Sequence, residues 1–183
     1  MLSVQTPPPE LSPIGRRVLV ARVTGPVGEQ IQTWRQEHDP AQARRLPPHA
    51  TLCYQPALQP IEAIEAQVRY AFPAQIRVWL GGVHELPNKD GTLVVRITQT
   101  DALEEARSRL FDARFAVMDG HRTFPWHITV VRYPRRGDLS ALQAAGAAFH
   151  VDAPWDVDTV SYLELQNGRY ESLAEWMLPG KTT

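Results

Sequence analysis

Two short segments, His49-Ala50-Thr51-Leu52 and His127-Ile128-Thr129-Val130, decide how this chain is organised. Each reads histidine, a small or apolar residue, threonine and an apolar residue, and each lies in a run that predicts a β-strand. Because side chains alternate between the faces of a strand, the histidine and threonine point to one side and the apolar residues point into the core. The chain has six histidines, and two such matches by accident have odds on the order of 1 in 200. Two facing strands of this kind would bring two imidazoles and two hydroxyls to one site.

The elements expected around these segments occur twice in the same order. Each half reads strand, helix, motif strand, helix, strand, with only slight sequence identity between the halves. The expected strands are 17–23, 49–54, 76–83, 93–98, 127–133, 157–165 and 170–178, and the expected helices are 29–38, 61–71, 101–111 and 139–149. The pattern predicts an α+β fold in which a duplicated β-α-β-α-β unit forms two pseudo-symmetric lobes around a central cleft.

Composition sets outer limits on domains, location and partners. Residues 1–15 predict a proline-rich N-terminal tail, and residues 16–183 a single bilobal domain with lobes of roughly 16–87 and 88–183. A formal net charge of −1 gives no overall signature for nucleic acid, so any RNA contact must come from a local patch or a short substrate. The lone Cys53 excludes an intramolecular disulfide and fits a reducing cytosol. Without a membrane-length apolar run or a secretory signal, we expect a cytoplasmic monomer that does not bind membranes.

The stretches Pro47–Tyr54 and Trp126–Arg132 resemble the motifs of the 2H phosphoesterase superfamily, and within it those of the LigT-like or 2′-5′ RNA ligase branch. The resemblance extends from about Arg17 to Leu178, and Ala50 departs from it where a larger aliphatic residue is commoner. It implies a LigT-like bilobal fold, a site without metal or cofactor, and phosphoester chemistry. The implied substrate is a 2′,3′-cyclic phosphate or 2′-5′ linkage of a nucleotide, a short RNA or a tRNA fragment, hydrolysed or, in reverse, ligated.

The chemistry of the residues agrees with this resemblance. Hydrolysis of a cyclic phosphodiester needs one proton removed from water and another delivered to the leaving oxygen, and two histidines can share these roles. The hydroxyls of Thr51 and Thr129 would donate hydrogen bonds to the non-bridging phosphate oxygens. By analogy with the family, His49 is the proton donor and His127 the acceptor, although the residues alone do not orient them.

Four further residues are candidates for binding the substrate. Arg132 could pair with phosphate, but strict alternation would turn it away from the histidines unless the strand bends or bulges. Tyr54, Trp126 and Tyr133 flank the motifs and could stack on a base, although aromatic residues in such places commonly belong to the core.

Two other classes of function remain open. A protein of the same fold could bind RNA or nucleotides without turnover. A metal-dependent hydrolase is the second alternative, but neither motif has another His, Asp or Glu within five residues. Turnover of a 2′,3′-cyclic nucleotide in excess chelator would separate the three possibilities.

Overall fold

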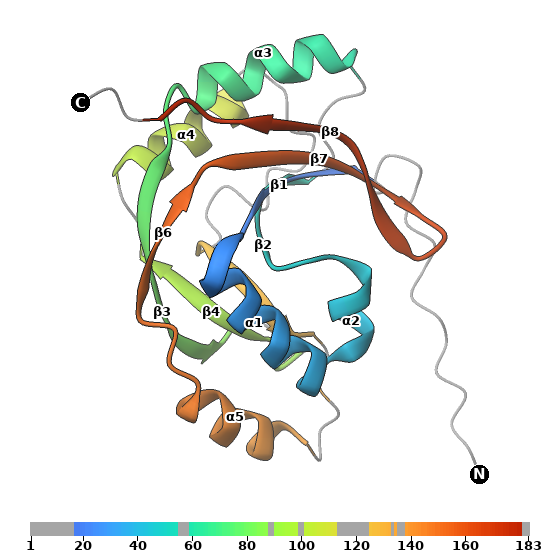
Figure 1. Cartoon of the computed structure of the whole chain (residues 1–183), viewed down its shortest axis with the longest axis vertical. Helices are drawn as coiled ribbons and strands as arrows, with labels where there is room; N and C mark the ends of the chain where they lie inside the picture. Colours follow the sequence, from blue (N-terminus) through green and yellow to red (C-terminus); the bar gives the residue numbers. More distant parts are fainter. Residues whose placement is uncertain are drawn as a thin grey trace.

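An antiparallel sheet runs through the part of the chain that the structure describes (Figure 1). The structure is a computed structural model, and it describes residues 17–54, 59–87, 90–98, 101–112, 125–132, 134 and 138–180. The strands are β1 (Arg17–Arg22), β2 (His49–Tyr54), β3 (Ile76–Glu85), β4 (Leu93–Thr98), β5 (His127–Val131), β6 (Ala153–Val157), β7 (Thr159–Gln166) and β8 (Arg169–Met177). The helices are α1 (Gly25–His38), α2 (Pro40–Arg45), α3 (Ile61–Ala71), α4 (Asp101–Asp112) and α5 (Leu139–Ala148). The predicted tail, residues 1–15, lies outside the described residues.

The order of strands in the sheet is β6-β3-β4-β5-β2-β1-β7-β8. The two motif strands, β2 and β5, are neighbours at its centre, and every pair of neighbours in this order is antiparallel. The α+β class is confirmed. The strands of the ranges 16–87 and 88–183 are interleaved, because β3 pairs with β4 and β6 while β7 pairs with β1. Each half of the sheet therefore draws strands from both ranges.

Two elements, α2 and β6, were not expected from the sequence, and each contains a proline. α2 follows α1 after a break at Asp39, and Asp39 Oδ1 caps it by accepting a hydrogen bond from the Gln42 N–H at 3.2 Å. Pro40 begins α2 without cost because a first-turn N–H has no partner within the helix. β6 tolerates Pro154 because it lies at one edge of the sheet. Pro40 thus marks the boundary between α1 and α2, and Pro154 marks an edge of the sheet.

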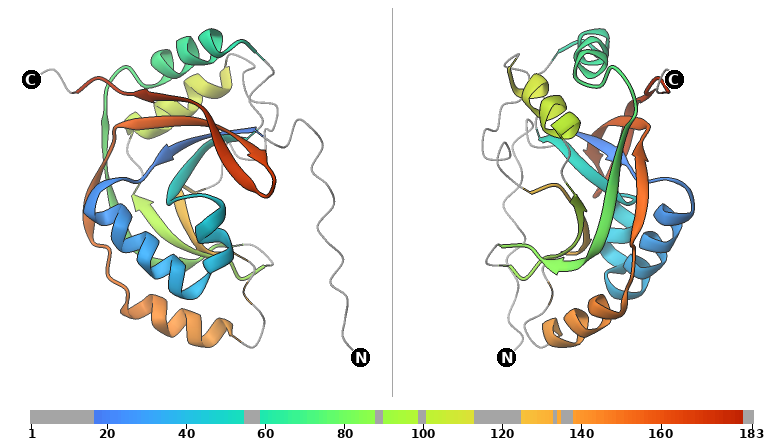
Figure 2. Two further views of the ribbon diagram at one scale, coloured as in Figure 1. Left: turned by 45° about the vertical axis from the view of Figure 1, so that its right-hand side comes forward. Right: turned by 90° about the vertical axis from the view of Figure 1, so that its left-hand side faces the viewer.

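Helices lie at both ends of the sheet (Figures 1 and 2). α3 and α4 are side by side at one end, and α1, α2 and α5 lie at the other. The apolar faces of α1, α3, α4 and α5 and one face of the sheet form a common core, in which Leu19, Ile31, Ile64, Leu110 and Ile128 are fully buried. Burial of each such side chain is worth about 1.5–3 kcal/mol. The apolar residues of the motif strands belong to this core, so their polar residues lie on the opposite face.

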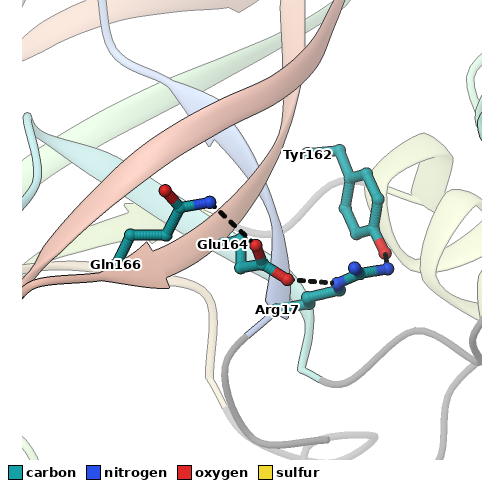
Figure 3. Close-up of polar contacts among 4 residues, drawn as sticks. All are labelled: Arg17, Tyr162, Glu164 and Gln166. Carbon is teal, nitrogen blue, oxygen red and sulfur yellow. Dashed lines mark hydrogen bonds and ion pairs between the residues drawn. The ribbon is translucent and has the colours of Figure 1, made fainter. Parts of the chain in front are cut away.

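A tight turn and a set of side-chain hydrogen bonds fix the register of β1, β7 and β8. Asn167 and Gly168 have positive φ angles of 49° and 80°, as the two central residues of a tight Asn-Gly turn require, and they join β7 and β8 in a hairpin. At the start of β1, Arg17 Nε donates to Glu164 Oε1 at 2.8 Å and Arg17 Nη1 donates to the Tyr162 hydroxyl at 3.2 Å (Figure 3). Because β1 pairs with both β7 and β2, these contacts help to position the first motif strand.

Candidate active site

The middle residues of the two motif segments face each other across the central strand pair. Ala50 of β2 pairs with Ile128 of β5, and both are buried, at 2% and 0% exposure. Because the two strands are antiparallel, the residues on either side of this pair also lie opposite each other, His49 opposite Thr129 and Thr51 opposite His127. One cavity of about 360 Å³ is lined by all four of these polar side chains, His49, Thr51, His127 and Thr129. The sheet thus joins two segments that are distant in the sequence.

Both motif strands contain a bulge at the same position, one residue after the threonine. Against β1, the register of β2 shifts around Leu52, which is the extra residue. Against β4, the register of β5 shifts around Val130 in the same way. An extra residue in a strand reverses the side to which the following residues point. The two bulges therefore change which side chains reach the cavity.

Beyond the bulges, Tyr54 and Arg132 face the cavity. Strict alternation would point Cys53 to the side of the histidine and Arg132 away from it, and neither side chain follows that alternation. Cys53 is fully buried in the core, where desolvation raises the pKa of its thiol to about 12. Arg132 comes directly after the end of β5 and lines the cavity. The physical reason is the one-residue bulge in each strand.

Each imidazole is oriented by the carbonyl group two residues before it. Nδ1 of His49 lies 2.8 Å from the Pro47 oxygen, and Nδ1 of His127 lies 2.8 Å from the Pro125 oxygen. A carbonyl oxygen can only accept, so in each neutral ring Nδ1 carries the hydrogen and Nε2 carries the lone pair. The sequence contained a signal for this arrangement, because a proline precedes each motif histidine by two positions.

Desolvation and neighbouring arginines lower the pKa of both imidazoles. Desolvation and, to a lesser extent, the charges of Arg35, His127 and Arg132 together lower the pKa of His49 to about 4, against the opposing hydrogen bond to the Pro47 carbonyl. The pKa of His127 is also lowered, chiefly by desolvation and then by Arg107 and Arg132. Both rings are therefore largely neutral at pH 7, and an anion bound between them would raise both pKa values.

The cavity is positively charged although the chain as a whole is not. Among the described residues, its charged side chains other than the histidines are Arg35, Arg45, Arg107, Arg132 and Asp90. Arg35 of α1 and Arg107 of α4 are almost fully buried, at 3% and 6% exposure. Burial lowers the pKa of Arg35 to about 10, which leaves it charged at neutral pH. The cavity is thus suited to an anionic ligand.

Sequence reasoning missed three of these arginines, Arg35, Arg45 and Arg107. A single arginine in an amphipathic helix is normally assigned to the solvent-facing side. A signal was nevertheless present, because Arg35 and Arg107 lie in the helices that follow β1 and β4, which are equivalent positions in the repeat. The repeat therefore places one buried arginine near each histidine.

Trp126 and Tyr133 are the remaining two residues that the sequence predicts to bind the substrate. Trp126 lines the cavity, but it is only 4% exposed and its Nε1 donates to Glu104 Oε1 at 3.0 Å. The Arg107 guanidinium lies 4.0 Å from the centroid of the Trp126 ring and covers one of its faces. Trp126 is thus built into the wall of the cavity. Tyr133 lies outside the described residues.

The groups that converge on the cavity are imidazoles, hydroxyls and guanidinium groups, which suit a phosphate. Within the described ranges, no three residues among His, Cys, Asp and Glu come together as a set that could hold a metal ion. In the same ranges, no helix has the length and apolar character needed to span a membrane.

Comparison with solved structures defines the class of fold. Escherichia coli LigT in its apo form matches with a TM-score of 0.59 at 19% identity, over 90% of this chain and 98% of LigT. The same protein complexed with 3′-AMP matches with a TM-score of 0.59 at 20% identity, over 90% and 98% of the two chains. TT0787 of Thermus thermophilus matches with a TM-score of 0.57 at 18% identity, over 91% and 100%. The chain therefore has the LigT-like fold.

The family follows from the sequence match. A family model described as the 2′-5′ RNA ligase superfamily matches residues 24–169, which is well over half of the chain. The chain therefore belongs to the 2′-5′ RNA ligase superfamily of 2H phosphoesterases, as the two motifs predicted. A comparison with curated proteins finds no match.

Proposed function

We propose that this protein is a metal-independent phosphoesterase acting on the 2′,3′-cyclic phosphate or 2′-5′ phosphodiester of a nucleotide or RNA end. One observation carries the proposal: two imidazoles, each held by a carbonyl at the same relative position, open onto one arginine-lined cavity. Membership of a phosphoesterase superfamily supports an enzyme. The proposed catalytic residues are His49, Thr51, His127 and Thr129, and the proposed substrate contacts are Arg132, Tyr54, Trp126 and, from the sequence alone, Tyr133.

In hydrolysis, the neutral acceptor imidazole takes a proton from water through Nε2 while the water oxygen bonds to phosphorus. The protonated donor imidazole gives its Nε2 proton to the departing 2′ or 3′ oxygen as the phosphorus–oxygen bond to the ribose breaks. Each well-placed acid or base contributes about 10²–10⁴-fold. The threonine hydroxyls and the guanidinium of Arg132 stabilise the charge that grows on the non-bridging oxygens. Ligation of a cyclic end to a 5′-hydroxyl uses the same groups in reverse.

The donor must take up its proton together with the substrate. Both imidazole pKa values are lowered in the free protein, and the negative charge of a bound phosphodiester opposes that shift. By analogy with the family, His49 is the donor and His127 the acceptor. A p-nitrophenyl phosphodiester has a leaving group that needs no proton. With it, His49→Ala should lose less activity than His127→Ala, and the reverse order would exchange the two roles.

The proposed partners are small. E. coli LigT has been crystallised with ATP and with 3′-AMP, which supports a nucleotide-sized ligand here. A cavity of about 360 Å³ is within the usual size of small-molecule sites. A nucleotide 2′,3′-cyclic phosphate or the end of a short RNA or tRNA fragment fits this size. The proposed chemistry needs no cofactor. We further propose a cytoplasmic monomer, and sedimentation equilibrium tests the monomeric state.

The decisive test is turnover of 2′,3′-cyclic nucleotides and 2′-5′-linked dinucleotides in excess EDTA. We expect the wild type to be active, and His49→Ala and His127→Ala each to reduce kcat by about 100-fold or more. His150→Ala serves as the matched control, because His150 is exposed and does not line the cavity. Activity that disappears in EDTA and returns with a divalent cation would favour the metal-dependent hydrolase. Binding without turnover would favour the non-catalytic module.

A further inference from the structure

One wall of the cavity contains a buried arginine that has no acidic partner within the described ranges. Arg35 is 3% exposed, its Nη1 donates to Gln32 Oε1 at 3.0 Å and its Nη2 donates to the Gln42 carbonyl oxygen at 3.2 Å. Its Nε is buried and has no hydrogen-bond partner among the described residues. A buried guanidinium held only by neutral groups is costly, unless a ligand supplies the negative charge.

The acidic group whose charge acts on Arg35 is already engaged elsewhere. Asp39 raises the pKa of Arg35 through its charge, but its carboxylate oxygens have other partners. Asp39 Oδ1 accepts from the Gln42 N–H at 3.2 Å, and its Oδ2 accepts from the Arg132 N–H at 2.8 Å. Both carboxylate oxygens therefore bind backbone groups, and among the described residues Asp39 forms no ion pair with Arg35, which lines the cavity.

A second arginine extends this wall. Arg45 lies three residues after Gln42 on α2, so the two occupy one face of that helix, and both line the cavity. The Arg45 guanidinium lies 5.6 Å from the centroid of the Tyr170 ring of β8, and its Nε is buried without a hydrogen-bond partner among the described residues. Arg35, Gln42 and Arg45 thus form a continuous surface with two donors that are not used within the described part of the protein.

We propose that Arg35 and Arg45 form a second anion subsite, which binds the 5′-phosphate of the nucleoside whose 2′,3′ edge lies between the two imidazoles. The inference rests on the proposed function, in which the histidines, threonines and Arg132 take the scissile phosphate. A second anion on the same nucleoside must then be carried on the far side of the ribose, where the 5′ oxygen lies. The cavity of about 360 Å³ is larger than one phosphate requires. Arg107 is not part of this subsite, because Glu104 and the Trp126 ring already contact it.

The test compares three substrates that share one base. The first is a nucleoside 2′,3′-cyclic phosphate with a free 5′-hydroxyl, the second carries a 5′-monophosphate, and the third is a dinucleotide whose terminal nucleoside carries the cyclic phosphate. We expect kcat/KM for the second and third to exceed that of the first by about 10- to 100-fold, the range of a hydrogen bond to a charged group. A preference for the second alone identifies a terminal phosphate monoester, and equal preference identifies any 5′-phosphate, including that of an RNA chain.

Variants assign the preference to the two arginines. Arg45→Gln and Arg35→Gln should each reduce the ratio of kcat/KM between the 5′-phosphorylated and unphosphorylated substrates, whereas a general structural defect would lower both values together. Arg45→Gln keeps the test valid if loss of the more deeply buried Arg35 prevents folding. Arg44→Gln is the matched control, because Arg44 is the exposed neighbour on α2, outside the cavity, and should keep the wild-type ratio.

Two negative results have different meanings. Turnover of the unphosphorylated substrate with no gain from a 5′-phosphate would overturn the second subsite and leave the proposed phosphoesterase intact. Failure to turn over any of the three substrates would overturn the proposed function, and the subsite with it. A wild-type preference that survives both arginine variants would also overturn the assignment of the subsite to this wall.

Discussion

Replacement of His49 by asparagine should make the folded protein less sensitive to acid. Desolvation lowers the pKa of this imidazole to about 4, whereas a histidine of the unfolded chain titrates near 6.5. As the pH falls below 6.5, the unfolded state binds a proton that the folded ring excludes, so the free energy of unfolding decreases. One pKa unit corresponds to about 1.4 kcal/mol. Between pH 6.5 and pH 4.5, an interval of about two units, the unfolded histidine is protonated while the folded ring stays mostly neutral. Because the ring is only half-buried, we expect His49 to account for about 2 kcal/mol of the stability lost between pH 7.5 and pH 4.5.

The measurement is urea unfolding, followed by tryptophan fluorescence, at these two pH values. His49→Asn should lose about 2 kcal/mol less than the wild type on acidification, whatever its stability at pH 7.5. His150→Asn is the control, since His150 is exposed and its replacement should leave the acid sensitivity unchanged. Equal losses for His49→Asn and the wild type would refute the argument that desolvation of this ring opposes its protonation.

Three further predictions concern the pH optimum of the reaction, the reactivity of the Cys53 thiol and the hydrogen bonds of Asp39. Because the pKa of both His49 and His127 is lowered, kcat/KM should follow a bell-shaped pH profile with its maximum below pH 6.5. The rate should fall at higher pH as the donor loses its proton. A flat profile between pH 5 and 8 would contradict the acid–base roles. Cys53 should react with a chromogenic disulfide reagent only after unfolding, because its buried thiol has a pKa of about 12; rapid reaction of the native protein would be inconsistent with this burial. Asp39→Ala should lower the free energy of unfolding by about 1 kcal/mol through loss of the α2 cap, and raise KM because the Arg132 N–H loses its acceptor. A destabilised variant with unchanged KM would make the Arg132 contact purely structural.

Local patterns in the sequence were sufficient for much of the fold. Alternation in the motif strands and the 3.6-residue period of the helices depend only on near neighbours, so they could be read directly. The Asn167-Gly168 turn was predictable because few residues adopt its positive φ angles. The repeated order of elements was enough to predict the α+β class. β6 was missed, because Pro154 argues against a strand unless its place at the edge of the sheet is known.

The sequence by itself determined which residues are the candidates for the chemistry, because the His-x-Thr spacing is a local property of a strand. Only the tertiary structure decided how they meet. Pairing of Ala50 with Ile128 depends on the long-range strand order, and the bulges at Leu52 and Val130 appear only when each strand is aligned with its neighbour. Those bulges turn Arg132 into the cavity, against strict alternation. The buried charge of Arg35 was equally invisible, since burial of a helical side chain is set by what packs around the helix and not by its own sequence.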